Sequence, residues 1–311
     1  MKIVLDILLI VLLFSGLSWL ADMVVRYVKK IATVLHLQMV TVGIIFGLIT
    51  TLPELSLGLN ATIQDVPTLA VGNLIGGMIV MLCLITGANI MINRSIVTDG
   101  NFRTILPKAL IIFSPIILGI DGNYSLWDGL IMIGLYIGMI YYMYVSKALT
   151  TIPKKQTVKI EVNQLIRSAF LVLIGMVGIL LISDWIINIT LELLNYFKVS
   201  QLVVGLSVFA IGTNLPEIII ALTAWKKKTP DLSISHVVSS AFTNVLVLGL
   251  LASMKPIDFF IDLDFMVMVL FLLLALLYYI LFYRSDKKFI FSEGVFLVVI
   301  YFLFIIATLI N

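Results

Sequence analysis

Residues 47–54 read Gly-Leu-Ile-Thr-Thr-Leu-Pro-Glu, and residues 210–217 read Ala-Ile-Gly-Thr-Asn-Leu-Pro-Glu. The two stretches are 163 residues apart, and one Thr, the Leu, the Pro and the Glu coincide between them. Each stretch lies at an equivalent depth inside a long apolar segment. A chance match of this kind is improbable, so the pair indicates an internal repeat.

The composition predicts that this repeat folds in a lipid bilayer. Of the 311 residues, 61% are hydrophobic and 12% are charged, and the mean hydropathy is +1.18. Such a chain has too few polar side chains to cover a water-exposed surface. We therefore expect a multi-pass protein of the cell membrane whose exterior mostly contacts lipid. The single cysteine, Cys83, excludes a disulfide within the chain and a cysteine metal cluster.

Apolar stretches long enough to cross a membrane follow one another along the chain. We predict ten of them, near residues 4–25, 38–63, 67–92, 103–120, 127–146, 168–190, 200–224, 233–254, 264–283 and 289–310. The longest polar connection, residues 147–167, divides the chain into residues 1–146 and residues 168–311, with five spans each. An odd number of spans per half places the halves in opposite orientation. The predicted fold is therefore an all-α polytopic membrane protein of ten transmembrane helices in two inverted five-helix repeats.

The Lys and Arg residues predict the orientation, because they accumulate in cytoplasmic loops. If the N-terminus is outside, only Lys2, Lys198 and Lys255 lie outside, which leaves 17 of the 20 basic residues inside. Both termini are then outside, and the 147–167 connection is cytoplasmic. If one span had been missed, the basic residues after it would change sides and the bias would be lost. The bias therefore also supports the count of ten.

Glu54 and Glu217 are the strongest candidates for a binding site. A carboxylate inside a membrane helix is costly unless it is paired or functional, and no Lys or Arg lies mid-span in this sequence. Thr50 and Thr213 each precede a Glu by four residues, which places hydroxyl and carboxylate on one helix face. The proline before each Glu leaves a carbonyl four residues earlier without its helical partner. An all-oxygen set of this kind suits Ca²⁺ and Na⁺ rather than zinc or copper.

A second pair of polar residues follows the second motif. Ser240 and Asn244 lie 23 and 27 residues after the motif glutamate and share a helix face. At the same spacing after the first motif stand Gly77 and Met81, so the repeat is not symmetric here. The spacing favours Ser240 and Asn244 as ligands, with a hydrogen bond between helices as the alternative. For the glycines at 72, 76 and 77 we favour close helix packing over exposure of the backbone to an ion.

These patterns resemble the alpha repeats of the Ca²⁺/cation antiporter superfamily, in particular the prokaryotic and archaeal sodium/calcium exchanger branch. That family repeats Gly-Thr-Ser-Leu-Pro-Glu on one span and Gly-Asn-x-x-Gly-Ser-Asn-x-x-Asn/Asp on the next. The loop at residues 120–129, Ile-Asp-Gly-Asn-Tyr-Ser-Leu-Trp-Asp-Gly, is similar to the corresponding loop of archaeal members. The proton-coupled branch places its glutamate in Gly-Asn-Ala-x-Glu, which this chain lacks. The resemblance therefore favours Na⁺ coupling.

The resemblance also implies a set of site residues and a mechanism. It makes Glu54 and Glu217 the central Ca²⁺-binding carboxylates. The other implied site positions are Thr50, Thr51, Thr213, Asn214, Ser240 and Asn244, with Gly47 and Ala210 at the start of the two motifs. The first and sixth spans would be gating helices that move across a fixed bundle. Carrying bare carboxylates through hydrocarbon is expensive, which is the physical basis of obligatory exchange.

The chain departs from the family pattern at several ligand positions. Gly77 and Met81 stand where the family has serine and asparagine, so one half lacks two oxygens, and Met81 offers only a soft sulfur. Thr51 and Asn214 each replace a serine. With two carboxylates and no third acid, the site can neutralise one divalent or two monovalent ions. A lost Na⁺ site, an altered stoichiometry and a changed ion preference all stay open.

The leading prediction is a secondary active antiporter that exchanges Na⁺ for Ca²⁺ by alternating access. The alternatives are an antiporter of the same fold with H⁺ or K⁺ coupling or another divalent cation, and a channel or non-transporting cation-binding protein. Nothing indicates an enzyme, since the sequence has no nucleotide-binding loop and no nucleophile beside a base. We expect no cofactor, no nucleic acid and no protein partner, and only the transported ions as ligands.

Three further residues have open roles. His236, near the start of the eighth span, has the residue type for a pH sensor, although a position at the membrane interface is favoured. Asp22 and Asp184 occupy comparable places in the first and sixth spans, 162 residues apart. They either touch the gate or are helix-end residues.

Overall fold

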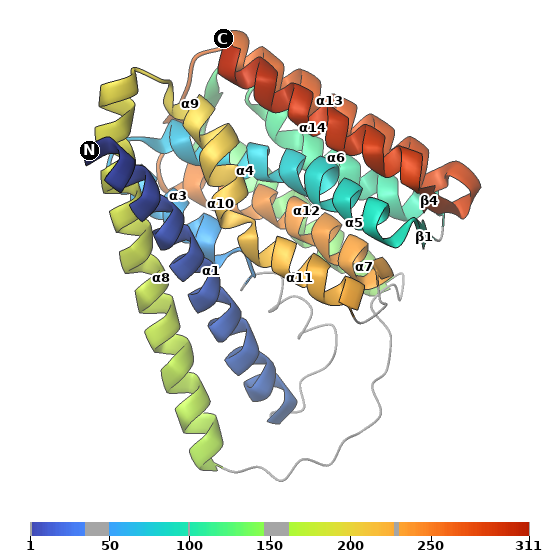
Figure 1. Ribbon diagram of the computed structural model, residues 1–311, viewed down its shortest axis with the longest axis horizontal. Helices are drawn as coiled ribbons and strands as arrows, with labels where there is room; N and C mark the ends of the chain where they lie inside the picture. The colour runs from blue at the N-terminus through green and yellow to red at the C-terminus, as the bar shows by residue number, and fades with distance from the viewer. Residues whose placement is uncertain (1, 35–49, 99, 146–161, 227–229, 311) are drawn as a thin grey trace.

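The computed structural model describes residues 2–34, 50–98, 100–145, 162–226 and 230–310 (Figure 1). Its α-helices are α1 (Lys2–Val34), α3 (Leu52–Ile63), α4 (Pro67–Ile79), α5 (Thr86–Asn93), α6 (Phe102–Leu118), α7 (Leu126–Val145), α8 (Val162–Phe197), α9 (Gln201–Val204), α10 (Ala210–Thr213), α11 (Leu215–Lys226), α12 (Pro230–Met254), α13 (Leu263–Arg284) and α14 (Phe291–Ile310). Two π-helical segments, η1 (Val80–Ile85) and η2 (Gly205–Phe209), and one 3₁₀ turn, η3 (Ser285–Lys287), join them. The strands are β1 (Ser95–Val97), β2 (Asn123–Tyr124), β3 (Ile257–Asp258) and β4 (Lys288–Ile290).

The described helices agree with the predicted ten-span fold. Seven spans are long and apolar enough to cross a membrane: Ile3–Val28, Pro67–Asn93, Leu126–Met143, Gln164–Phe197, His236–Met254, Leu263–Lys287 and Phe291–Ile310. The fourth predicted span is a shorter apolar helix, Ile105–Leu118. The second and seventh spans carry the two motifs and are treated with the site. The sixth begins earlier than predicted, because α8 already includes residues 162–167 of the expected connection.

Two long helices form a separate pair on one flank of the molecule. Figure 1 shows α1 and α8 side by side, with the other helices gathered beyond them. The membrane-spanning part of α8 is only 17% buried, whereas the span formed by α4, η1 and α5 is 89% buried. The α4 span is therefore the centre of the bundle, and α8 lies at its edge.

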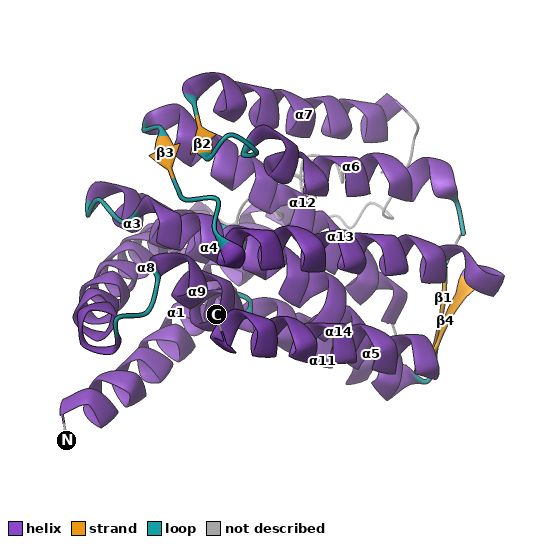
Figure 2. Ribbon diagram, turned by 90° about the horizontal axis from the view of Figure 1, so that it is seen from above, coloured by secondary structure: helices purple, strands orange, loops and turns teal. Residues whose placement is uncertain are grey.

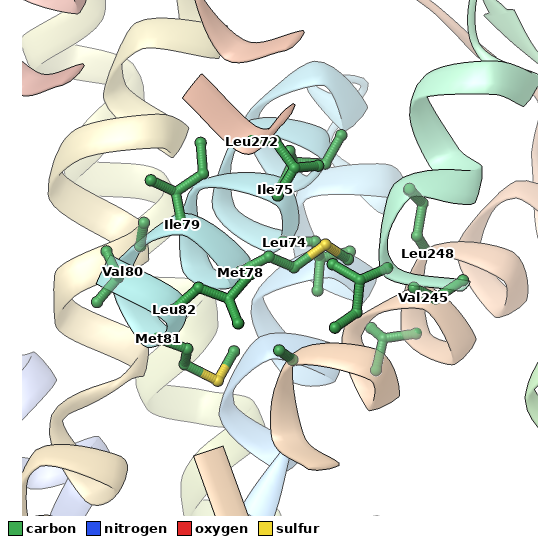
Figure 3. Packing of buried hydrophobic residues seen from close by; sticks show 14 of the residues in the cluster. Leu74, Ile75, Met78, Ile79, Val80, Met81, Leu82, Val245, Leu248 and Leu272 are labelled. Carbon is green, nitrogen blue, oxygen red and sulfur yellow. The ribbon is translucent and has the colours of Figure 1, made fainter. Parts of the chain in front are cut away.

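The centre of the bundle is close-packed. Figure 3 shows the side chains of Leu74 and Met78 on α4 near those of Val245 and Leu248 on α12. All four side chains are 0% exposed. Because lipid is as apolar as these side chains, the helices are held by van der Waals packing rather than by the hydrophobic effect. The precision of this packing fixes the position of the polar groups on the same helices.

Two glycines let α4 and η2 approach at backbone distance. A Cβ on Gly72 would lie 2.5 Å from the carbonyl oxygen of Leu202, and a Cβ on Gly205 would lie 2.4 Å from that of Leu69. Neither distance leaves room for a side chain. The packing role predicted for Gly72 is therefore confirmed, and it brings the two halves of the chain into direct backbone contact.

Two short β-ribbons join the halves at opposite ends of the bundle (Figure 2). β1 pairs antiparallel with β4, with Ser95 opposite Ile290, and β2 pairs antiparallel with β3, with Asn123 opposite Asp258. The repeat offset of 163 carries β1 onto residues 258–260, beside β3, and carries β2 onto residues 286–287, beside β4. Each ribbon is thus the counterpart of the other, and each pairs one loop from either half.

Candidate cation site

The two motifs interrupt their helices at equivalent residues. Thr51, immediately before α3, has φ −92° and ψ 10°, and Asn214, immediately before α11, has φ −86° and ψ 10°. Both conformations fall in the sparsely populated bridge region between helix and strand. In each motif a proline follows two residues later, where the start of a new helix does not need its missing N–H. The repeated sequence therefore produces a repeated helix break, the geometry at which transporters bind ions.

Glu54 and Glu217 occupy the first turns of the helices that follow the breaks. They are 1% and 0% exposed, and each lies where the positive end of a helix dipole favours a carboxylate. The two carboxylates are close enough to repel each other. Within the described residues, neither oxygen of Glu54 and only Oε1 of Glu217 has a hydrogen-bond partner. Among the described residues, no buried basic side chain neutralises the two carboxylates. A bound cation would neutralise them.

The residues predicted from the spacing after Glu217 lie at the site. Ser240 Oγ donates a hydrogen bond of 3.1 Å to Glu217 Oε1. Asn244, one turn further along α12, is fully buried, and its Nδ2 donates to the carbonyl of Leu74 at 3.1 Å. Its Oδ1 has no partner among the residues that the structure describes. The amide of Asn244 thus forms a hydrogen bond between two helices, which was the alternative to a ligand role. Its oxygen is still without a partner in the described region.

Asn214 lies at the second break itself and is fully buried. Its Nδ2 donates to the carbonyl of Ala210 at 2.7 Å, and its Oδ1 has no partner in the described part of the chain. A Cβ built on Gly77 would lie 2.9 Å from this nitrogen and 3.1 Å from Nδ2 of Asn244. Gly77 therefore lies against two site amides and not against the backbone of another helix.

Asn73 lies at the candidate site, although the sequence did not lead us to expect it there. Its side chain is 0% exposed, and its Oδ1 accepts a hydrogen bond of 3.1 Å from Thr213 Oγ1, across the two halves. Thr213 also donates to the carbonyl of Phe209 at 3.1 Å. Asn73 stands in the glycine-rich stretch 72–77, for whose glycines we weighed close helix packing against exposure of the backbone to an ion. Its repeat equivalent is His236, whose Nε2 is buried without a partner in the described region.

The remaining predictions fall into four groups. Thr50 and Thr51 are buried at the first break, 1% and 2% exposed. Gly47 lies outside the described residues. Met81 is fully buried in η1, where its carbonyl accepts the hydroxyl of Thr86 at 2.9 Å. In the second motif, the carbonyl of residue 212, which we expected to be left without a partner, receives the backbone N–H of the residue at the break.

The site is chemically uniform. Five of the buried oxygens that lack partners among the described residues belong to Glu54, Glu217, Asn214 and Asn244. The described residues contain no cluster of three or more His, Cys, Asp or Glu side chains. Carboxylate and amide oxygens without nitrogen or sulfur donors favour hard cations such as Ca²⁺ and Na⁺. Such a cation would satisfy the oxygens and neutralise the two carboxylates together.

Polar contacts hold α8 against the helix that follows the first break. Gln64 Nε2 donates to Asp184 Oδ1 at 2.9 Å, and Asn60 Nδ2 donates to the carbonyl of Leu180 at 3.3 Å. These contacts join the flanking helix pair to the helix that carries Glu54. Asp184 therefore contacts the residue that ends α3, and its role at a gate stays a prediction.

A cavity of about 310 Å³ lies beside the first break, between α1, α3, α8 and α12. Thr51 and Leu52 line it on α3, Val24 and Val28 line it on α1, and Met176 lines it on α8. On α8, the cavity reaches Met176 and the polar contacts begin at Leu180. These two residues are about one helical turn apart. Apart from Thr51, the residues that line this cavity are apolar.

Comparison with known proteins places this geometry in context. The sequence pattern of the family described as "Sodium/calcium exchanger protein" matches residues 5–145 and 167–310. Inner membrane protein YrbG of Escherichia coli (strain K12) is 26% identical over 267 residues, which are 82% of this chain and 79% of that protein.

Two solved structures share the fold. A crystal structure of the H⁺/Ca²⁺ exchanger CAX has a TM-score of 0.72 and 17% identity, covering 98% of this chain and 86% of that one. A structure of the sodium-calcium exchanger NCX_Mj has a TM-score of 0.64 and 23% identity, covering 96% of both chains.

Proposed function

Because the chain belongs to the sodium/calcium exchanger protein family, we propose that it is a secondary active antiporter that exchanges Na⁺ for Ca²⁺. The observation that carries the proposal is the group of buried, partnerless oxygens at the two helix breaks. A family of membrane exchangers and an all-oxygen site with two carboxylates support the same conclusion. The choice of Na⁺ as the coupling ion is the finer part of the proposal, since the fold is common to Na⁺ and H⁺ exchangers.

The charge of the site explains why the two ions would be exchanged. Glu54 and Glu217 supply two negative charges, which one Ca²⁺ or two Na⁺ neutralise. The ions compete because both need the same oxygens, with Thr50, Thr51, Thr213, Asn214, Ser240 and Asn244 completing the set. If the site were empty, its two uncompensated carboxylate charges would have to pass the apolar side chains of α1 and α8. Placing charges in apolar surroundings costs free energy. The gates therefore move when an ion is bound.

The helix pair α1 and α8 is the moving part in this proposal. The polar contacts at Gln64 and Asp184 close one side of the site, and the cavity at Thr51 lies on the other. If both termini are outside, as the basic residues predict, the closed side is external and the cavity is cytoplasmic. Sliding of the pair would open the polar contacts and fill the cavity.

Ion flux into proteoliposomes tests the proposal. We expect ⁴⁵Ca²⁺ uptake into Na⁺-loaded vesicles with an outward Na⁺ gradient, and none with an outward K⁺ or H⁺ gradient. Glu54→Gln removes one of the two charges and should abolish uptake. Glu293→Gln is the matched control, because Glu293 also lies in the first turn of a helix but is satisfied by the backbone N–H of Ile290 at 2.9 Å. Absence of Na⁺-driven uptake by a folded preparation would refute Na⁺ coupling.

A proton-coupled Ca²⁺ exchanger is the second candidate. One observation favours it: the two side-chain oxygens of the family pattern that are lost at Gly77 and Met81. It predicts uptake driven by an outward H⁺ gradient and abolished by a protonophore. Uptake that persists with the protonophore and requires internal Na⁺ would exclude it.

A further inference from the structure

The basic cluster is a group of five exposed side chains around the β1–β4 ribbon, at one end of the bundle (Figure 2). Two contacts bring together the segments that carry them. Val97 stands opposite Lys288 in the ribbon, and the guanidinium of Arg284 lies 5.0 Å from the centre of the Phe102 ring. Both halves of the chain contribute to the cluster, whose members are Arg94, Arg103, Arg284, Lys287 and Lys288.

The charges of the basic cluster are not neutralised by neighbouring side chains. None of its members forms an ion pair with another residue that the structure describes. The segments 94–103 and 284–288 contain two acidic residues, Asp99 and Asp286, so together they keep a net charge of +3. Asp99 lies outside the described residues, and Asp286 is exposed. The surface around the ribbon therefore favours an anion.

The equivalent ribbon at the opposite end of the bundle is built differently. Around β2 and β3 the polar groups satisfy one another: Asn123 Nδ2 donates a hydrogen bond to Asp258 Oδ1, and Lys255 forms an ion pair with Asp65. A ribbon that joins the two halves thus holds together without unpaired cations. The cations of the basic cluster have no counterpart in that structural task.

The basic cluster lies where apolar spans meet the membrane boundary. Exposed apolar side chains stand among the cations: Val97 is 75% exposed, Phe291 46% and Phe102 40%. The preference of Lys and Arg for cytoplasmic loops accounts for cations at this end, but not for apolar side chains exposed between them. Cationic and apolar side chains together are typical of a surface in the lipid headgroup layer. Two apolar helices end at the cluster and two begin just after it: Pro67–Asn93, Leu263–Lys287, Ile105–Leu118 and Phe291–Ile310.

We propose that the basic cluster binds the headgroups of anionic phospholipids in the leaflet at this end of the bundle. The phosphate and the net negative charge of such a headgroup match the Lys and Arg donors, and the exposed apolar side chains contact the adjoining acyl chains. If both termini are outside, as the basic residues predict, this leaflet is the cytoplasmic one. A bound headgroup would contact both halves of the chain. The binding does not depend on which ions the protein exchanges.

Thermal unfolding of the purified full-length chain in detergent tests the proposal, with phosphatidylglycerol as the anionic probe and phosphatidylcholine as the zwitterionic one. We expect phosphatidylglycerol to raise the unfolding temperature by on the order of 5 °C more than phosphatidylcholine does. Lys287→Gln with Lys288→Gln should lose at least half of this difference. Lys287→Arg with Lys288→Arg should keep it, because both charges remain.

The matched control is Lys198→Gln with Lys255→Gln, which removes two exposed lysines outside the basic cluster. Lys198 has φ 54°, close to the 52° of Lys287, so the two positions have similar backbone conformations. We expect the control pair to keep the full difference between the two lipids. A loss as large as that of the pair at 287 and 288 would mean that phosphatidylglycerol responds to overall charge, and would overturn the proposal.

Two further outcomes would overturn it: equal stabilisation of the wild type by both lipids, and a full difference in the Gln pair at 287 and 288. A second measurement needs no variant. Raising the ionic strength to about 0.5 M with choline chloride should reduce the difference in the wild type, because salt screens exposed charges. An unchanged difference would contradict binding by the basic cluster. None of these measurements involves ion flux, so the proposed function is tested separately.

Discussion

Ser240 Oγ donates a hydrogen bond of 3.1 Å to Oε1 of Glu217, and the serine comes from a helix that begins after the glutamate's own helix has ended. The contact links α12 to the first turn of α11 inside the bundle. It leaves Oε2 of Glu217 without a partner in the described region, so one oxygen is held and the other is available. The hydroxyl thus fixes the orientation of the carboxylate.

Ser240→Ala should weaken Ca²⁺ binding while leaving the fold intact. A hydrogen bond to a charged group contributes about 1.5–3 kcal/mol, so we expect the Ca²⁺ concentration for half-saturation to rise about tenfold or more. Ser240→Thr keeps the hydroxyl and should restore most of the affinity. Measurement is by ⁴⁵Ca²⁺ binding, with thermal unfolding as the check on the fold. Equal affinities for the Ala variant and the wild type would show that the contact only joins two helices.

Asn73→Ala should impair the site from the other half of the chain. Without its Oδ1, the hydroxyl of Thr213 turns wholly to the carbonyl of Phe209. Loss of a buried hydrogen bond costs about 1 kcal/mol, which corresponds to roughly fivefold weaker Ca²⁺ binding. The matched control is Asn93→Ala, because the side-chain hydrogen bonds of Asn93 among the described residues stay within its own helix and go to Asn89. If both variants bind Ca²⁺ like the wild type, Asn73 is not part of the site.

Which residues gather at the candidate site could be predicted from the sequence better than the contacts that they make there. Glu54, Glu217 and Ser240 could be found because spacing along a helix fixes which side chains share a face. Asn73 could not be found in this way, because its partner lies 140 residues away on the other half and only packing brings them together. The orientation of the amide of Asn214 depends likewise on where the break places the carbonyl of Ala210.

The architecture was predictable for a different physical reason. Apolar length and the position of Lys and Arg are properties of single segments, and a bilayer imposes both. The helix break at Thr51 and Asn214 was only partly predictable. Proline at 53 and 216 indicated an interruption, but the tight local turn that engages the carbonyl of residue 212 depends on the backbone angles at the break.

Gly205→Ala should destabilise the bundle itself. The added methyl group would lie 2.4 Å from the carbonyl oxygen of Leu69, which belongs to a helix backbone and cannot rotate away. Overpacking of this kind costs about 1–3 kcal/mol, so the unfolding temperature in detergent should fall by several degrees, on the order of 2–8 °C. Gly138→Ala, with nothing within 4 Å of its Cβ, should unfold like the wild type. Equal unfolding temperatures for both variants would mean that α4 and η2 are not in close contact.

Fixing α8 to α3 should stop transport if the flanking pair moves. Gln64 and Asp184 touch at 2.9 Å across that interface, so cysteines at both positions of a Cys83→Ser background can be joined by a short bifunctional thiol reagent. We expect the joined protein to bind Ca²⁺ but to exchange it at least about tenfold more slowly, because alternating access requires this interface to open. Each single cysteine treated with the same reagent controls for its bulk. A control pair at Asn123 and Asp258, which face each other in the ribbon of β2 and β3, should leave exchange unchanged when joined, because both strands belong to the fixed bundle. Full exchange by the protein joined at 64 and 184 would mean that α8 does not move relative to α3.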